Sequence, residues 1–109
     1  DFVYVGDVVE ANLLSLETDG IDGQVFNVGT GKSVSINELC DVLLELTGNE
    51  DISPVYEEAR QGDIRHSRGD IGKIRKEMGY EPTVSLREGL KDIVDTLDNF
   101  EDFVSSPEE

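Results

Sequence analysis

The residues best suited to chemistry in this sequence are Arg60-Gln61-Gly62-Asp63 and the basic segment that follows them. The whole chain has 9 Lys and Arg residues against 25 Asp and Glu, a formal net charge of −16, yet positions 60–76 hold six basic residues and only two acidic ones. Local positive charge on so acidic a background indicates an anion site. Arginine suits phosphate because its planar guanidinium donates two parallel hydrogen bonds to neighbouring oxygens. Since Arg60 lies beside a glycine in a predicted loop, where binding residues concentrate, we predict that it is the anion ligand.

Other charged residues of this segment have plainer interpretations. Lys73, Arg75 and Lys76 fall on a predicted helix, and we expect them to be its solvated face. Asp63, taken alone, would be interpreted as a loop carboxylate that accepts hydrogen bonds from nearby amides. The charge pattern therefore supports Arg60 more strongly than its neighbours.

The sequence contains few residues that could serve in catalysis or metal binding. His66 is the sole histidine and Cys40 the sole cysteine, so neither a Cys-rich zinc site nor an intramolecular disulfide can form. We expect His66 to form a loop hydrogen bond rather than act as a general base, and Cys40 to be a small core residue on a helix. No carboxylate pair stands out among the acids. The residues predict a binding portion with no catalytic residue and no metal site.

The glycine-rich stretch Gly29-Thr30-Gly31-Lys32-Ser33 resembles a phosphate-binding loop only superficially. A P-loop would need glycine at position 26, which is Phe26. A dinucleotide fingerprint would place its third glycine on Ser33 or Val34. We expect instead that these glycines let the chain turn sharply and approach another group closely.

The elements that must position these residues are short. Runs of β-branched and aromatic residues predict strands at Phe2–Val5, Val25–Val28 and Ile52–Tyr56. Pro54 restricts the last of them to a sheet edge or a strand start. The predicted fold class is therefore α/β, with short strands and three to four helices.

The helices are predicted from caps and from apolar spacing. Asp7 is expected to cap the first helix, whose buried stripe would be Val9, Leu13 and Leu16. The second begins at the capping box Ser35-Ile36-Asn37-Glu38.

Two further helices are expected in the second half of the chain. Asp70 is expected to cap a short helix that Gly79 ends. Ser85-Leu86-Arg87-Glu88 forms another capping box, which opens the last helix. We expect one domain over residues 1–104 and a frayed tail at residues 105–109.

Composition bounds the class of protein. A net charge of −16 argues against binding to nucleic acid or to an anionic membrane surface. The longest apolar run is four residues, far short of the roughly 20 that span a bilayer, and no signal peptide is visible. These features predict a cytoplasmic protein. Two interpretations of the acid excess stay open: a solubility device for a high-salt cytoplasm, which we favour, or binding of divalent cations.

Several short motifs occur in an order typical of one family. They are Asp-Phe-Val-Tyr-Val-Gly-Asp-Val-Val at positions 1–9, Phe-Asn-Val-Gly-Thr-Gly at 26–31, Ser-Ile-Asn-Glu-Leu at 35–39, Arg-Gln-Gly-Asp at 60–63, Gly-Tyr-Glu-Pro at 79–82 and Ser-Leu-Arg-Glu-Gly-Leu at 85–90. Together they resemble the C-terminal third of the NAD-dependent epimerase/dehydratase family, the extended short-chain dehydrogenase/reductases. The UDP-sugar 4-epimerases are the branch that the sequence resembles most.

The resemblance implies a role for four residues. In the family, the arginine of Arg-x-Gly-Asp binds the diphosphate of the nucleotide sugar and the aspartate binds the ribose hydroxyls, which implies Arg60 and Asp63 here. The apolar residue after the first capping-box serine packs on the base, which implies Ile36. The aromatic residue after the family's Arg-Asp contacts the nucleotide, which implies Phe2. For Ile36 and Phe2, plain core packing explains the residue type equally well.

The resemblance also implies what the chain lacks. The family's Gly-x-x-Gly-x-x-Gly loop for NAD and its catalytic Tyr-x-x-x-Lys pair are not in this sequence. We therefore expect a UDP-sugar-binding portion of an NAD-dependent enzyme, inactive alone and binding no cofactor itself. Ser67 stands where some epimerases carry tyrosine, so the sugar stays open.

Two alternative interpretations of the function stay open. The first is a dehydratase or decarboxylase of nucleotide sugars, and the second is a stand-alone acidic interaction module. We also expect exposed strand edges and apolar faces to allow self-association.

Overall fold

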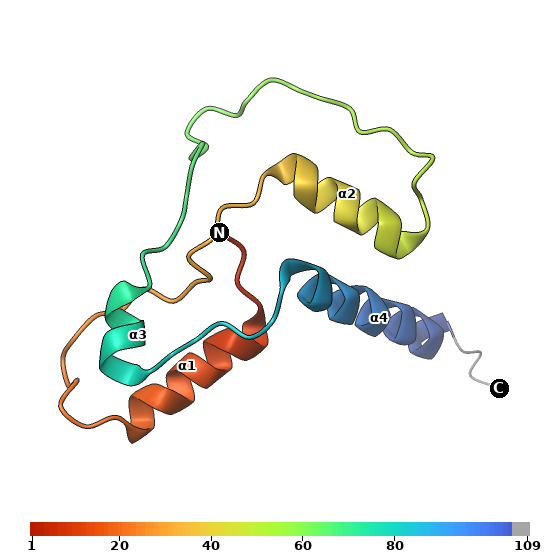
Figure 1. The fold of residues 1–109 in the computed structure, drawn as a ribbon. Helices are drawn as coiled ribbons and strands as arrows, with labels where there is room; N and C mark the ends of the chain where they lie inside the picture. Colours follow the sequence, from red (N-terminus) through yellow and green to blue (C-terminus); the bar gives the residue numbers. More distant parts are fainter. Residues whose placement is uncertain (106–109) are drawn as a thin grey trace.

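The computed structural model describes residues 1–105 of the chain, and the side chains of residues 1–99. It contains four helices: α1 (Val5–Glu17), α2 (Ile36–Thr47), α3 (Gly72–Met78) and α4 (Leu86–Ser105). Long extended segments join them into an open arrangement (Figure 1). None of the described helices is both long enough and apolar enough to cross a membrane. The predicted tail at 105–109 falls outside the described residues except for Ser105, which ends α4.

The predicted strands are absent from residues 1–105, and this part of the α/β prediction was wrong. Phe2–Tyr4, Val25–Val28 and Ile52–Tyr56 have no regular structure, and Val5 already belongs to α1. A strand exists only where a second segment pairs with its backbone amides and carbonyls. Each of these segments runs singly (Figure 1), so strand propensity alone produces no sheet. Because the predicted strands do not form within residues 1–105, the prediction of exposed strand edges was wrong as well.

The predicted capping box at Ser85 is confirmed in full, and the one at Ser35 is confirmed for its serine cap. The Ser85 amide donates to the Glu88 carboxylate at 3.2 Å, and the Glu88 amide donates to Ser85 Oγ at 3.1 Å. At the start of α2, the Glu38 amide donates to Ser35 Oγ at 3.0 Å. Gly79 ends α3 in the left-handed conformation, with φ of 69°. These signals are local, so they hold whatever the rest of the chain does.

The predicted role of Asp7 was wrong. Helix α1 begins at Val5, so Asp7 lies inside its first turn rather than before it. The Asp7 side chain is only 2% exposed. Its carboxylate accepts hydrogen bonds from the Thr83 amide and hydroxyl, both at 3.1 Å, and from the Val84 amide at 3.2 Å. Asp7 therefore anchors the connector between α3 and α4 to the side of α1.

The predicted buried stripe of α1 was also wrong. Val9, Leu13 and Leu16 are exposed, whereas the inner face of the helix carries Asp7, Ala11 and the partly buried Leu14. These two sets lie on opposite sides of α1. The sequence pattern selected the more apolar set, because a buried aspartate lowers the apparent hydrophobicity of the true inner face.

The core lies where α1, α3 and the following connector meet (Figure 1). It consists of a small buried cluster with partly buried residues packed around it: Ala11, Ile71, Ile74 and Tyr80, then Leu14, Phe26 and Met78. Tyr80 is fully buried, and its hydroxyl donates to the Gly29 carbonyl at 2.9 Å. Burial raises the pKa of Tyr80. We use the name hub for this cluster together with Asp1, helices α1 and α3, and the loop residues 29–31 and 79–84.

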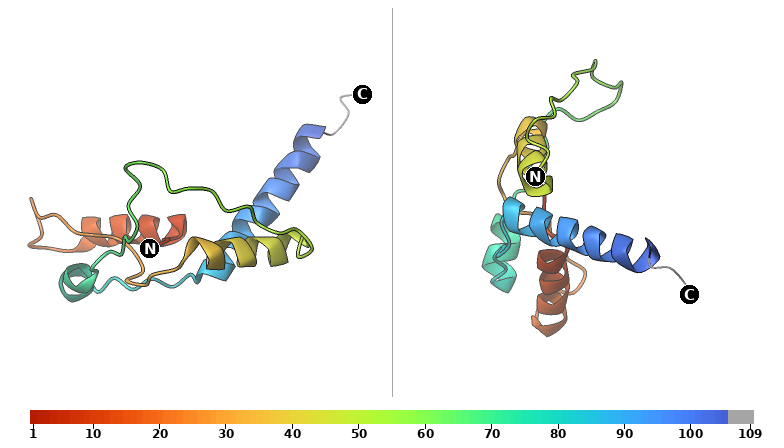
Figure 2. Two further views of the ribbon diagram at one scale, coloured as in Figure 1. Left: turned by 90° about the horizontal axis from the view of Figure 1, so that it is seen from above. Right: turned by 90° about the vertical axis from the view of Figure 1, so that its right-hand side faces the viewer.

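Helices α2 and α4 pack against each other beside the hub. Arg87 of α4 forms an ion pair with Glu45 of α2, and Tyr4 donates a hydrogen bond to the Asp92 carboxylate. That hydrogen bond is the main reason why the pKa of Tyr4 is raised. Cys40, on α2, is partly buried rather than in a tight core. Between α2 and α3, residues 49–70 form an exposed arm that arcs outward from the helices and then returns toward them (Figure 1 and Figure 2).

Candidate functional site

The arm makes a tight turn at Arg60-Gln61-Gly62-Asp63. The Asp63 amide donates to the Arg60 carbonyl at 3.2 Å, and Gly62 has a φ of 90°. Glycine at the third position with positive φ is the signature of a type II turn, which holds its two end residues within about 7 Å of each other. The turn therefore places Arg60 and Asp63 side by side, and both side chains are exposed.

Beyond this turn, the arm returns to the start of α2 and forms a hollow with it. The hollow has a volume of about 620 Å³ and is lined by Phe2, by Ile36 and by the segment Ile64–Ser67, together with Asp1, Glu38 and residues 33–35. The structure thus brings Phe2 and Ile36 to one surface. Arg60 and Asp63 do not line the hollow: they lie on the turn immediately before its wall.

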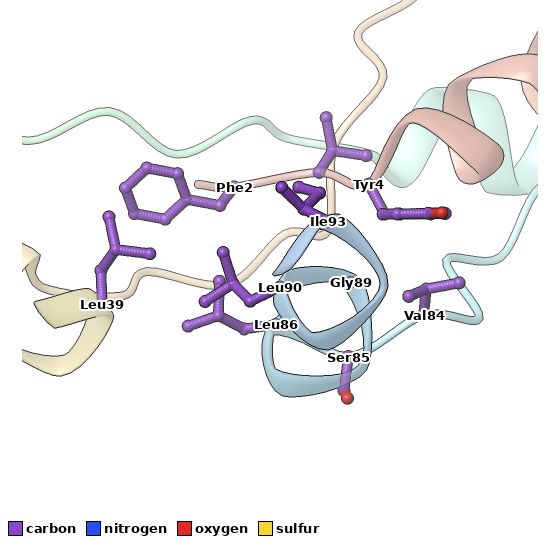
Figure 3. Close-up of a pocket in the computed structure, with 10 residues that line it drawn as sticks. Phe2, Tyr4, Leu39, Val84, Ser85, Leu86, Gly89, Leu90 and Ile93 are labelled. Carbon is purple, nitrogen blue, oxygen red and sulfur yellow. The ribbon is translucent and has the colours of Figure 1, made fainter. Parts of the chain in front are cut away.

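Phe2 also borders a second, smaller hollow. Figure 3 shows its ring beside Leu39 of α2, with Leu90 of α4 close by. This second hollow has a volume of about 150 Å³. Phe2 is 39% exposed, so these neighbours cover only part of its side chain. Ile36 differs, because it is 69% exposed at the first position of α2. Core packing does not account for Ile36.

The glycine-rich loop closely approaches Asp1, and a close approach to some group is what its glycines predicted. The Asp1 carboxylate accepts hydrogen bonds from the Thr30 amide at 3.0 Å, the Thr30 hydroxyl at 2.6 Å, the Gly31 amide at 3.0 Å and the Gly69 amide at 3.2 Å. A Cβ atom added to Gly29 would lie 2.8 Å from an Asp1 oxygen. The amides of Thr30 and Gly31 therefore already have an acceptor within the chain, the Asp1 carboxylate.

The roles of Asp1 and Asp7 were missed in the sequence. Each binds a segment where a threonine offers its amide and hydroxyl together, at Thr30 and at Thr83. That pairing is a usable signal for a carboxylate partner. It does not identify which of the 25 acids will supply the carboxylate.

The basic residues of α3 are exposed, as expected, but two of them also have structural partners. The Lys73 ammonium donates to the Val25 carbonyl at 2.9 Å and lies 4.5 Å from the centroid of the Phe26 ring. Arg75 forms an ion pair with Glu81 at 3.0 Å. These contacts attach the helix to neighbouring loops. Of the other basic residues of positions 60–76, Lys76 is exposed on α3, and Arg60, Arg65 and Arg68 lie on the arm.

Comparison with known proteins identifies the class to which these elements belong. A sequence model of the GDP-mannose 4,6 dehydratase family matches residues 1–93. The solved UDP-glucose 4-epimerase of Thermotoga maritima, determined with UDP-glucose, is 47% identical and superposes with a TM-score of 0.84 over 92% of this chain and 31% of that one. The fold is thus that of part of an extended short-chain dehydrogenase/reductase. This match and the curated relatives together show that the chain belongs to the NAD-dependent epimerase/dehydratase family.

Two further relatives give the same result. The putative UDP-glucose 4-epimerase of Methanocaldococcus jannaschii is 37% identical over 99 residues, which are 91% of this chain and 31% of that protein. The UDP-glucuronic acid 4-epimerase of Bacillus cereus, solved with a fluorinated UDP-glucuronic acid and NAD, is 29% identical and has a TM-score of 0.83 over 92% of this chain and 32% of that one. The chain spans about a third of the length of each.

Proposed function

We propose that this chain is the nucleotide-sugar-binding portion of an NAD-dependent enzyme similar to UDP-glucose 4-epimerase. The observation that carries the proposal is the meeting of Phe2 and Ile36 on one hollow whose wall follows directly on the Arg60–Asp63 turn. Family membership supports it, as does the likeness to the T. maritima epimerase, which was solved with UDP-glucose. The parent enzyme is proposed to act in the cytoplasm.

Each part of the surface has a proposed task. The Arg60 guanidinium binds the diphosphate, where a planar fork gives two charge-assisted hydrogen bonds. The Asp63 carboxylate accepts hydrogen bonds from the ribose hydroxyls. The type II turn fixes the spacing between these two groups before the ligand arrives, which lowers the entropy lost on binding. Phe2 and Ile36 offer apolar surface to the base, and the exposed Ile36 side chain gains most by being covered.

NAD and the catalytic step belong to the rest of the parent enzyme in this proposal. The glycine-rich loop of this chain is filled by the Asp1 carboxylate, and the sequence has no Tyr-x-x-x-Lys pair. The chain by itself is therefore expected to bind a UDP-sugar without converting it.

A dehydratase is the second candidate, because the matching family model is described by GDP-mannose 4,6 dehydratase. A dTDP-glucose 4,6-dehydratase or a UDP-glucuronate decarboxylase would use the same binding surface. Activity of an enzyme assembled from this chain, assayed with UDP-glucose, dTDP-glucose and UDP-glucuronate in turn, separates these candidates by which sugar is consumed.

The experiment that tests the proposal is an NMR titration of the chain with UDP. Amide signals of Arg60, Asp63 and Ile36 are expected to shift together, and Arg60→Ala is expected to weaken the affinity by about ten- to a hundredfold, as for the loss of a hydrogen-bonded charge. Lys76→Ala is the matched control, because it removes one exposed positive charge from the same basic segment but outside the turn. Equal weakening by both variants would mean that UDP senses only the local charge, and would contradict the proposed site.

A further inference from the structure

The arm carries three exposed arginines, and each lies in a different place. Arg60 is on the turn, outside the hollow that Phe2 and Ile36 share. Arg68 lines a separate hollow of about 390 Å³ beside α3. Arg65, in contrast, lines the hollow of about 620 Å³ itself. The arm therefore brings a second arginine to the surface that the proposed function assigns to the base.

The charge of Arg65 is not used by the fold. Arg65 is the one arginine or lysine among the described residues that line the hollow. It forms no ion pair with any side chain that the structure describes. Of the two acids that line the same hollow, Asp1 already accepts four hydrogen bonds from the hub, and Glu38 belongs to the α2 wall. A free guanidinium beside apolar surface is how a pocket orients a ligand that has one charged end.

The backbone on either side of Arg65 is held in place. Before it, the Asp63 amide is bonded to the Arg60 carbonyl. After it, the Ser67 carbonyl accepts a hydrogen bond of 2.7 Å from the amino group of Asp1, where the arm passes the N-terminus (Figure 1). Two residues span at most about 7 Å, and the turn holds its end residues within about 7 Å of each other. Arg60 and Arg65 are therefore close enough to bind neighbouring groups of one ligand.

We infer, resting on the proposed function, that Arg65 is a second phosphate ligand and binds the phosphate attached to the ribose. In a nucleotide sugar each phosphate of the diphosphate carries one negative charge, so one arginine leaves the other charge without a partner. The phosphate attached to the ribose is the one nearer the base, and Arg65 lines the hollow that is assigned to the base. Arg60, outside the hollow, then binds the phosphate attached to the sugar. The two guanidinium groups match the diphosphate in charge and in number of acceptors.

Titration with three ligands that differ only in phosphate tests this inference. Uridine, UMP and UDP are each added to the wild-type chain and to Arg65→Ala at 0.15 M ionic strength, and Kd is measured by NMR. Arg65→Ala is expected to raise the Kd of UMP and that of UDP by about tenfold each, as for the loss of a charge-assisted hydrogen bond. The Kd of uridine, which has no phosphate, should not change. Arg60→Ala is expected to weaken UDP more than UMP.

Arg68→Ala is the matched control, because it removes an exposed arginine from the same arm but from a different hollow. Its effect on the Kd of UDP is expected to stay below about threefold, since charges outside the site are screened over about 8 Å at this ionic strength. Arg65→Lys keeps the charge but lacks the planar fork, so it should restore only part of the affinity. Circular dichroism of Arg65→Ala should match that of the wild type, because the residue is exposed.

Four results would overturn the inference. They are an unchanged Kd of UDP in Arg65→Ala, a loss for UDP without a loss for UMP, an equal loss for uridine, and an equal loss in Arg68→Ala. If Arg60→Ala still weakens UDP in any of these cases, the proposed function stands and only the role of Arg65 falls. If the wild-type chain binds neither UMP nor UDP, both proposals fail together.

Discussion

The carboxylates of Asp1 and Asp7, in the hub, and the carboxylate of Asp63, on the arm, have opposite surroundings. Asp1 and Asp7 each accept three or more hydrogen bonds from the chain itself, and Asp7 is almost completely buried. Asp63, on the arm, is exposed at the end of a turn. A carboxylate that is saturated by internal donors serves the fold, whereas one held in place but left open is available to a ligand. The same contrast separates Arg75, paired with Glu81 in the hub region, from Arg60.

The largest expected effect comes from breaking the hub. Asp7→Ala leaves the Thr83 amide and hydroxyl and the Val84 amide without their acceptor, and is expected to lower the free energy of unfolding by about 3 kcal/mol. Urea denaturation followed by circular dichroism measures this loss. Asp41→Ala, at an exposed position of α2, is the control and should change stability little. Similar midpoints for the two variants would contradict the structural role of Asp7.

The next effect belongs to the arm and should appear in binding alone. Arg60→Ala is expected to leave the free energy of unfolding within about 0.5 kcal/mol of the wild type, as for an exposed side chain away from structural features. Its affinity for UDP should nevertheless fall. Measuring the urea midpoint and the UDP affinity of the same preparation checks both parts of this prediction, the unchanged stability and the weaker binding. A loss of stability equal to that of Asp7→Ala would remove the contrast between arm and hub.

A smaller effect is expected at Gly62, whose φ of 90° suits glycine. Gly62→Ala should strain the turn by about 1 kcal/mol and so misplace Arg60 relative to Asp63, lowering UDP affinity about fivefold. Gly62→Asn, which tolerates positive φ better, should lose less. Calorimetric titration of the two variants makes the comparison. Full affinity in Gly62→Ala would show that the turn does not preorganise the pair.

The smallest effect is a pH dependence of the hub. Burial raises the pKa of Tyr80 in the folded chain above its ordinary value. The folded state therefore holds this proton more tightly than the unfolded state, and the stability so gained is present below about pH 10 and declines as the pH rises beyond it. Urea midpoints measured across that range should fall less steeply in Tyr80→Phe. The same variant should be slightly less stable at neutral pH, because the Gly29 carbonyl loses its donor. A profile unchanged by the substitution would exclude Tyr80 as the titrating group.

What the sequence predicted correctly is local. The capping box at Ser85, the serine cap at Ser35 and the helix end at Gly79 depend on groups within a few residues of one another. The strands were predicted wrongly because a strand depends on a partner that these segments do not find within residues 1–105.

The helix faces show a second kind of limit. The exposed side of α1, with Val9, Leu13 and Leu16, is more apolar than its buried side. A prediction that assigns the most apolar stripe to the core therefore selects the wrong side. For the site, charge alone drew attention to Arg60. That Phe2 and Ile36 line one hollow could not be predicted from charge or spacing, because it depends on how the arm returns to α2.

The Asp1 carboxylate also has a consequence for how the chain assembles. It joins segments 29, 30 and 68 positions away along the sequence. Helical proteins usually fold quickly because most of their contacts are close in sequence, whereas contacts between distant positions must first overcome the entropy of closing long loops. We therefore expect the helices to form early and the Asp1 junction to close late. Although its described secondary structure is helical, the chain should fold at the slower pace of proteins rich in long-range contacts.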